Sequence, residues 1–280
     1  MLLAKNPYVQ RLISLSIEED LGMGDVTTSA VVLPNLNSRA ILLAKQDLIV
    51  CGQEIAQEVF RVLDQSIGYE IVVADGTKVS SGTVIARVSG PAIAVLEGER
   101  TALNFIQRMT GVATITSRYA ALLSGSGIRL TDTRKTVPGW RVLDKYAIVV
   151  GGGQNHRFNL GSGILIKDNH IAIAGSVSAA VQMAKTRACH SFKIEVEVTN
   201  LEQLRDAIHA GADIVLLDNM DDEQLVLAVK EVQHRCSIEV SGGITFPRLA
   251  KLVRMGIQFI SVGALTHSAP AADISLEIVG

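Results

Sequence analysis

The sequence predicts an α/β fold in which consecutive strand–helix units build a parallel sheet. The chain has 280 residues, of which 48% are hydrophobic and only 19% are charged, so it can bury a large core. In its second half, short β-branched runs end in a polar residue and are followed by an amphipathic helical pattern and a glycine. The strand ends at Glu197, Asp218, Ser241 and Gly263 lie 21, 23 and 22 residues apart. That spacing leaves room for one crossover helix between successive parallel strands.

Composition excludes several functional classes. A net charge of -2 provides no broad basic field for nucleic acid or an acidic membrane surface. The three cysteines are odd in number and lack metal-ligand spacing, so neither a disulfide framework nor a zinc site is expected. No apolar run approaches the ~20 residues that cross a bilayer, and no signal-peptide pattern is visible. We therefore expect a cytoplasmic protein.

The charged strand Lys193 to Val198 indicates where the active site lies. Lys193, Glu195 and Glu197 alternate along it and share one face, whereas a strand in a parallel barrel is normally apolar on both faces. An edge strand with one wet face would also explain the pattern. Six successive strands end in a polar residue or glycine, however, which favours a barrel interior whose upper layer is catalytic. These ends lie near Asp132, Lys167, Glu197, Asp218, Ser241 and Gly263.

The first ~100 residues have a different pattern. Arg39 to Val50 is rich in strand-forming residues, Glu54 to Leu63 reads as a helix, and Tyr69 to Pro91 reads as a β-meander. A long helical segment follows from Glu97 to about Leu123, and we expect Gly111 to interrupt it. This segment would join the first domain to the second.

Basic side chains cluster in two loops that follow strands and in the glycine-rich loop between them. Because these loops meet at one rim, the positive charge there is unfavourable without an anion. The planar fork of arginine fits carboxylate or phosphate, and lysine acts as a point charge. The cluster therefore predicts a phosphate-bearing, polyanionic substrate pair. Its members are Arg134, Lys135, His156, Arg157, Lys167 and His170.

Two glycine loops add a candidate phosphate site. Ser241-Gly242-Gly243 and Val262-Gly263-Ala264 each end a strand and precede a helix start. Glycine allows backbone N–H groups to approach an anion there, and the helix dipole favours it. The last pair of loops in a barrel is a frequent phosphate site, so we favour phosphate binding over a purely structural turn.

With these motifs in place, the chain resembles, nearly end to end, the quinolinate phosphoribosyltransferases. These are the decarboxylating nicotinate-nucleotide pyrophosphorylases of NAD biosynthesis. The order and spacing of nine segments carry the resemblance. They are Glu18 to Thr28, Glu99 to Phe105, Asp132 to Thr136, Gly151 to Arg157, Ile166 to Ile171, Glu195 to Val198, Leu216 to Met220, Ser241 to Ile244 and Ser261 to Leu276.

The resemblance implies a particular domain organisation. Residues 1–105 would form an N-terminal α+β open sandwich, with residues 266–280 packing back on it. Residues 106–265 would form an incomplete TIM-like α/β barrel that carries the active site. The family also implies a homodimer or hexamer in which the sandwich of one subunit covers the barrel mouth of its neighbour.

The resemblance also implies roles for individual residues. Arg100 would reach the neighbouring subunit's site, and Mg²⁺ would accompany phosphoribosyl pyrophosphate, with Glu197 and Asp218 at the ribose or the metal. The implied catalytic residues are Lys135, Lys167, Glu197 and Asp218. The implied substrate-binding residues are Arg100, Thr133, Arg134, Lys135, His156, Arg157, Lys167, His170, Glu197, Asp218, Ser241, Gly242, Gly243, Val262, Gly263 and Ala264.

The implied activity is transfer of a phosphoribosyl group to quinolinate with loss of CO₂, giving nicotinate mononucleotide and pyrophosphate. One alternative is a related transferase with another acceptor, of the molybdenum-transport-associated type. Another is a non-catalytic sensor of phosphate ligands, which would need the cations but not Glu197 and Asp218. Trp140 and the Gly161-Ser162-Gly163 segment depart from the usual family pattern close to the substrate loops.

Overall fold

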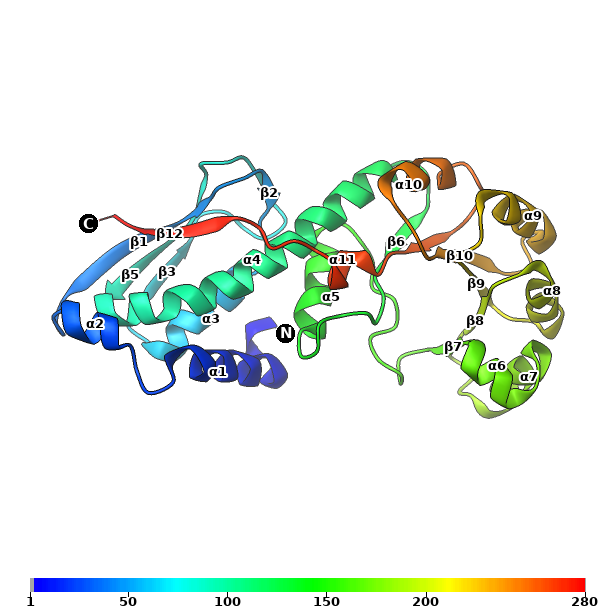
Figure 1. Ribbon diagram of the computed structural model, residues 1–280, viewed down its shortest axis with the longest axis horizontal. Coiled ribbons are helices and arrows are strands. Elements are labelled where there is room, and N and C mark those ends of the chain that lie inside the picture. Colours follow the sequence, from blue (N-terminus) through cyan, green and yellow to red (C-terminus); the bar gives the residue numbers. More distant parts are fainter. Residues whose placement is uncertain (1–2, 280) are drawn as a thin grey trace. The chain divides into compact units, whose positions relative to one another are not determined.

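The computed structural model describes residues 3–279 and divides into two compact units (Figure 1). The first unit comprises the chain through Ser117, the segment Val137–Gly152 and the chain from Ser268 onward. The second comprises Arg118–Thr136 and Gly153–His267. Each unit is thus assembled from segments that are distant in the sequence.

The second unit contains a six-stranded parallel sheet in the order β6-β11-β10-β9-β8-β7. Its two edge strands, β6 and β7, do not pair with each other, so the sheet does not close into a complete barrel. The expected incomplete α/β barrel is confirmed, as is the parallel sheet of consecutive strand–helix units. The strands are β6 Arg129–Thr131, β7 Ile164–Ile166, β8 Ile194–Val198, β9 Ile214–Asp218, β10 Ser237–Ser241 and β11 Phe259–Ser261.

Short helices connect these strands, and α7, α8 and α9 lie along the outer side of the sheet (Figure 1). Helix α8 shows how local sequence sets their bounds. Asn200 caps its first turn by accepting a hydrogen bond from the Gln203 N–H at 2.9 Å, and Gly211 ends it at a left-handed φ of 79°. The helices are α6 Asp168–Ala174, α7 Val177–Arg187, α8 Leu201–Ala210, α9 Asp222–Val232, α10 Phe246–Leu252 and α11 Ala264–His267.

The first unit is built around an antiparallel sheet in the order β12-β1-β5-β3. The C-terminal strand β12 pairs with β1, so both ends of the sequence contribute to one sheet. Its strands are β1 Asn37–Ala44, β3 Gly68–Ile71, β5 Val84–Pro91 and β12 Ile274–Ile278, and β2 Leu48–Ile49 pairs separately with β4 Lys78–Val79. Its helical elements are the 3-10 helix Leu3–Lys5, α1 Pro7–Leu21, α2 Val26–Val31, α3 Gln53–Leu63 and α5 Arg141–Val150.

Helix α4 runs without a break from Ala92 to Leu122. It therefore continues through the domain boundary that the sequence predicted after residue 105. The interruption expected at Gly111 is therefore wrong. A Cβ atom at Gly111 would lie 2.0 Å from the carbonyl oxygen of Pro270. The glycine permits the C-terminal segment to pass directly against the helix backbone.

Replacing Gly111 with alanine is accordingly expected to destabilise the protein, although alanine is the better helix former. The methyl group must displace backbone at Pro270, and overpacking of this kind costs about 1–3 kcal/mol or more. Thermal melts would measure the loss, with Gly161→Ala in an exposed loop as the control. A Gly111→Ala protein as stable as wild type would contradict the packing explanation.

Helix α4 is long, with 31 residues, but charged side chains such as Glu97, Glu99 and Arg100 occur along it. Across residues 3–279, no helix combines the length and the apolar character needed to span a membrane. The three cysteines are present as free thiols, with Cys51 buried and Cys189 exposed.

Candidate functional site

A cavity of about 500 Å³ opens in the second unit at the carboxyl ends of the parallel strands. Strand register explains why polar groups meet there. Asp218 and Ser241 are direct partners across β9 and β10, and Glu197 lies near the end of the neighbouring strand β8. Each of these three residues lines the cavity, as do the loops that follow β6 and β7. This is the edge of a parallel barrel at which catalytic groups collect.

Four cationic side chains line this cavity: Arg134, Lys135, Arg157 and Lys167. Together with His156, they are five of the six basic residues that the sequence assigned to one rim; His170 does not line the cavity. Burial, followed by the neighbouring Arg134 guanidinium, lowers the pKa of Arg157, and the Glu195 carboxylate acts in the opposite direction. Such a concentration of positive charge is suited to a polyanionic ligand.

Lys135 is held in place by two hydroxyl groups. Its N–H donates to Thr133 Oγ1 at 3.0 Å, and its carbonyl accepts from Thr266 Oγ1 at 2.8 Å. A Cβ at Gly263 would lie 3.1 Å from Cδ of Lys135, so the lysine stem crosses the glycine backbone. The Val262–Ala264 loop therefore supports Lys135 and is not part of the cavity lining.

Two carboxylates face these cations. Lys167 Nζ pairs with Glu197, which joins the loop after β7 to the end of β8. Asp218 accepts a hydrogen bond from Asn219 Nδ2 at 2.8 Å. Glu239, deeper in the cavity, is nearly fully buried, and burial followed by the Glu195 carboxylate raises its pKa to about 7.

The loop after β10 contributes glycines that the geometry requires. Gly242 has a φ of 86°, and a Cβ there would lie 2.1 Å from Asn219 Oδ1. Arg248 braces this loop by donating to the Gly242 carbonyl at 2.8 Å and to the Met220 carbonyl. The backbone beside Ser241 is thus fixed and open to the cavity, as an anion site needs.

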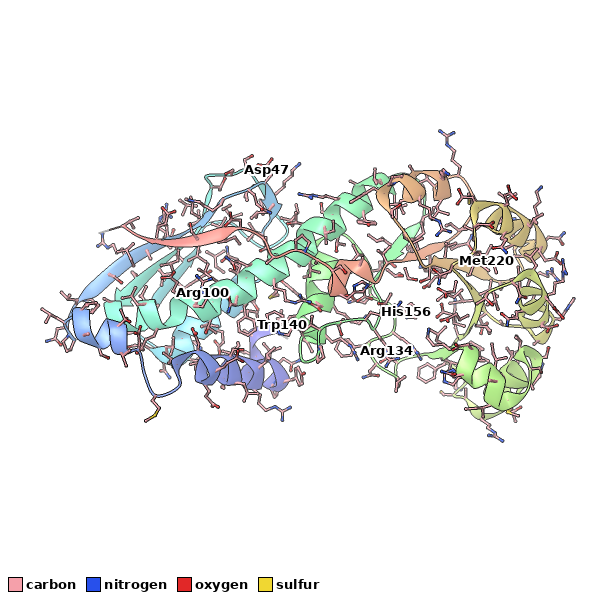
Figure 2. The ribbon with its side chains drawn as sticks, viewed as in Figure 1. Asp47, Arg100, Arg134, Trp140, His156 and Met220 are labelled. Atoms are coloured by element: carbon pink, nitrogen blue, oxygen red, sulfur yellow. The ribbon has the colours of Figure 1, made fainter. Side chains whose placement is uncertain are left out.

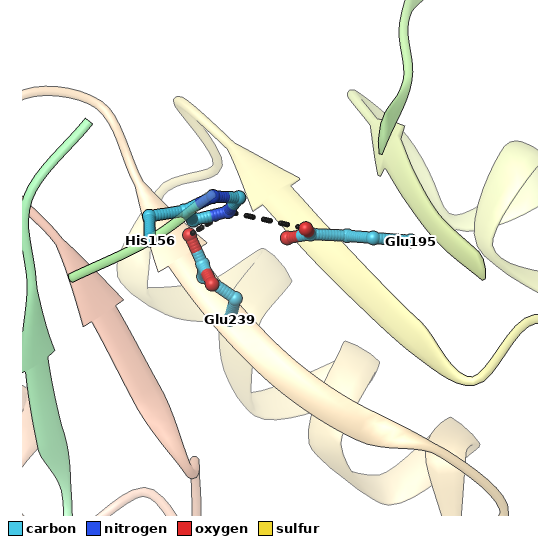
Figure 3. Close-up of side chains that lie close together, drawn as sticks. All are labelled: His156, Glu195 and Glu239. Atoms are coloured by element: carbon cyan, nitrogen blue, oxygen red, sulfur yellow. Dashed lines mark ion pairs between the residues drawn. The ribbon is translucent and has the colours of Figure 1, made fainter. Parts of the chain in front are cut away.

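His156 lines the same cavity, and both of its ring nitrogens already have protein partners. Nδ1 accepts from the Arg157 backbone N–H at 2.7 Å, and Nε2 lies 3.1 Å from Glu195 Oε2 (Figure 3). The His156 backbone N–H donates to the buried Asp132 carboxylate at 2.7 Å. The ring therefore links Arg157 to Glu195 within the site.

Other expected site residues lie away from this cavity lining. The His170 ring accepts a hydrogen bond from the Lys167 backbone N–H at 2.9 Å, so it supports the loop that carries Lys167. Arg100 is exposed on α4 in the first unit (Figure 2). Trp140 stacks on Phe105, with ring centroids 4.9 Å apart, also within the first unit. The substrate roles of Arg100 and His170 remain predictions.

Gly163 is the member of the Gly161-Ser162-Gly163 segment that reaches the site. Its carbonyl accepts a hydrogen bond from Arg157 at 3.1 Å. A Cβ there would stand 3.5 Å from the Arg157 side chain, which is ordinary contact. The glycine-rich segment therefore braces a cation of the cavity through its backbone.

The sequence interpretation missed Glu239 as a site residue, and it did not assign a role to Glu195. Asn219, Ser261, Leu165 and Leu216 also line the cavity and were not anticipated. A signal for Glu239 was available, because it alternates with Ser241 along β10 as Glu195 alternates with Glu197 along β8. Leu165 and Leu216 carry no such signal, since a strand leucine looks the same whether it faces the core or a ligand.

An open α/β barrel with this charged cavity defines an enzyme class that acts on polyanionic substrates at the carboxyl ends of its strands. The chain matches the family described as quinolinate phosphoribosyl transferase, C-terminal domain, over residues 112–277, and the N-terminal domain of the same family over residues 25–110. It belongs to the quinolinate phosphoribosyltransferase family.

Individual relatives agree with this assignment. The chain is 42% identical over 270 residues to a probable nicotinate-nucleotide pyrophosphorylase (carboxylating) of Bacillus subtilis, covering 96% of this chain and 93% of that protein. It is 38% identical to the corresponding protein of Methanocaldococcus jannaschii, with 97% and 98% covered. The solved nicotinate-nucleotide pyrophosphorylase of Francisella tularensis superposes with a TM-score of 0.91 at 40% identity, with 99% of each chain covered.

Proposed function

We propose that this chain transfers the phosphoribosyl group of phosphoribosyl pyrophosphate to quinolinate with decarboxylation, in the biosynthesis of NAD. The observation that carries the proposal is the cavity in which Arg134, Arg157 and Lys167 face Glu197 and Asp218. Quinolinate brings two carboxylates and its partner brings phosphates, so both need cations. Neither alternative acceptor chemistry nor a sensor function is favoured, because the Bacillus subtilis and Methanocaldococcus jannaschii relatives are both named as carboxylating pyrophosphorylases.

Each side of the cavity suits one substrate. Arg134, Arg157 and Lys167 would hold the quinolinate carboxylates, and His156 would keep Arg157 in place through its backbone. The Ser241-Gly242-Gly243 loop would hold the 5-phosphate of the ribose. Lys135, whose stem crosses Gly263, would stand between the two substrates.

The reaction then needs no protein nucleophile. The pyridine nitrogen forms a bond to the anomeric carbon as the bond to pyrophosphate breaks, through an oxocarbenium-like state. Carboxylates near the ribose stabilise the positive charge that develops there. The pyridinium next accepts the electron pair of the adjacent carbon–carbon bond as CO₂ leaves, and the ring carbon takes up a proton.

Mg²⁺ fits this site as an ion carried mainly by the substrate. Mg²⁺ prefers oxygen ligands and is commonly bound by one or two carboxylates plus substrate phosphates. Glu197 is already paired with Lys167, whereas Asp218 and the Ser241 hydroxyl are oxygen donors side by side. Bound there, Mg²⁺ would neutralise the leaving pyrophosphate.

Two further features belong to the proposal. We expect a homodimer or hexamer in which each active site is shared, with Arg100 acting in the neighbouring subunit's site. We also place the enzyme in the cytoplasm, which is supported by three free cysteines, because disulfides are rare in reducing compartments.

One assay tests the activity directly. Purified protein with phosphoribosyl pyrophosphate, Mg²⁺ and quinolinate labelled in the 2-carboxylate should release labelled CO₂ and pyrophosphate in equal amounts. Nicotinate in place of quinolinate gives the contrasting acceptor. Turnover of nicotinate alone, or no pyrophosphate release with quinolinate, would overturn the proposal.

Glu197→Gln should reduce kcat more than it reduces quinolinate affinity. The amide keeps the shape but removes the charge that faces the ribose cation, and losing one such electrostatic interaction costs about 10²-fold in rate. Kinetics and calorimetric quinolinate binding would separate the two effects, with the exposed Glu202→Gln as control. Weak quinolinate binding combined with normal kcat would contradict the assigned role.

A further inference from the structure

Glu195 has no assigned part in the reaction and does not line the substrate cavity, but it forms a three-residue layer with His156 and Glu239, which do line it. His156 Nε2 lies 3.1 Å from Glu195 Oε2 and 3.7 Å from Glu239 Oε1 (Figure 3). Glu195 is 5% exposed and Glu239 is 3% exposed. Burying two carboxylates is costly unless they have a defined partner, so the layer calls for an explanation.

Strand alternation places this layer between two cavities. Glu197 of β8 lines the substrate cavity, while Glu195 of β8 and Lys193, which precedes the strand, line a second cavity of about 330 Å³. Ile214 and Phe259, which begin β9 and β11, also line the second cavity, so it lies toward the amino ends of the strands. His156, Arg157 and Glu239 line both. The layer is therefore the floor of the substrate cavity, with a hollow beneath it and not packed core.

The His156 ring on this floor is held by hydrogen bonds at both of its nitrogens. With Nδ1 accepting from the Arg157 N–H, the ring proton lies on Nε2 and is donated to Glu195. Glu239, at 3.7 Å, is beyond hydrogen-bond reach of the same nitrogen. Within this layer, Glu195 is thus the acceptor that holds Nε2 of the ring.

Arg157 depends on this ring. Its backbone N–H is held by His156 Nδ1, and its guanidinium is held by the Gly163 carbonyl at 3.1 Å. Rotation of the His156 ring would release the first of these two contacts. Arg157 would then keep its guanidinium contact with the Gly163 carbonyl but lose the backbone contact with His156.

We propose that Glu195 is a positioning residue of the carboxylate-binding side of the cavity, acting through His156 on Arg157. It does not itself touch substrate, since it lines the second cavity and not the first. The inference rests on the proposed function, because quinolinate carboxylates are the ligands that Arg157 would receive.

Three substitutions of Glu195 distinguish the effect of its side-chain length from the effect of its negative charge. Glu195→Leu removes the acceptor, Glu195→Asp keeps the charge but shortens the reach, and Glu195→Gln keeps an oxygen acceptor without the charge. We expect Glu195→Leu and Glu195→Asp to raise the KM for quinolinate about tenfold, the effect of losing one hydrogen bond to a buried group. Glu195→Gln should keep this KM within about threefold of wild type, and the KM for phosphoribosyl pyrophosphate should stay near wild type in all three variants.

The matched control is Glu58→Leu, another buried glutamate, which accepts hydrogen bonds from Arg61 and Gln10 in the first unit. It should lower stability and leave both KM values unchanged. If Glu195→Leu does not fold, the comparison of Glu195→Asp with Glu195→Gln still tests the inference. Equal quinolinate KM values in Glu195→Asp, Glu195→Gln and wild type, or a parallel rise in KM for both substrates, would overturn it. Wild-type protein that fails to convert quinolinate would instead refute the proposed function.

Discussion

Lys167→Ala is expected to lower kcat/KM for quinolinate by about 10³-fold. Removing one preorganised electrostatic group commonly costs about 10²- to 10³-fold in rate, and this loss lies at the upper end of that range. Lys167 is the cation that joins the loop after β7 to Glu197, and it faces the same cavity as Arg134 and Arg157. Alanine removes the charge that would meet a quinolinate carboxylate. It also leaves Glu197 without its lysine partner on the ribose side.

The fold should be nearly unaffected by this change. The Lys167 side chain is 42% exposed, and ion pairs at such exposure contribute only about 0–1 kcal/mol to stability. Lys251→Ala is the matched control, because Lys251 also pairs with a carboxylate, Asp222, at 3.0 Å but is 67% exposed outside the cavity. Kinetics and thermal melts of both variants make the comparison. A Lys167→Ala protein that melts far below wild type would mean that the lysine is structural.

The sequence predicted the parts of the fold that depend on short-range signals. The ends of α8 depend on such signals, because Asn200 and Gly211 act within the first and last turns of the helix. The polar ends of the barrel strands were located because alternation and β-branched residues define each strand locally. Since carboxyl ends of parallel strands share one edge, convergence of Lys167, Glu197 and Asp218 on one cavity followed from topology alone.

Predictions failed where a distant segment decides the local structure. Gly111 was expected to break a helix, but the glycine serves the close approach of Pro270, which lies far along the chain. Periodicity carries no information about such a contact.

The interior of the site shows the same limit. Alternation correctly put Glu195 and Glu197 on the inner face of a barrel strand and not on a wet edge, whereas Lys193 precedes that strand. It could not tell which of the three lines the substrate cavity, because that depends on the depth of each residue in the sheet. Glu239 became recognisable as the partner of Glu195 only once β9 had placed β8 and β10 on either side of it.

If active sites are shared between subunits, activity should return when two inactive variants are mixed. Arg100 lies on α4 in the first unit, whereas Lys167 lines the cavity of the second. In the family that this chain belongs to, we expect that arginine to serve the neighbouring subunit's site. Arg100→Ala and Lys167→Ala homodimers should therefore each be nearly inactive, since every site lacks a required cation.

Mixing and reassembling the two variants should create heterodimers in which one site collects both defects and the other collects none. For random pairing of equal amounts, about half of the dimers are mixed and each has one intact site, so activity should approach about one quarter of wild type. Arg118→Ala mixed with Lys167→Ala is the matched control, because Arg118 is exposed and does not line the cavity, so its mixture should show only the sum of the parent activities whether or not subunits exchange. If exchange is demonstrated but recovery never exceeds the sum of the two parent activities, Arg100 acts within its own chain or has no role in the site.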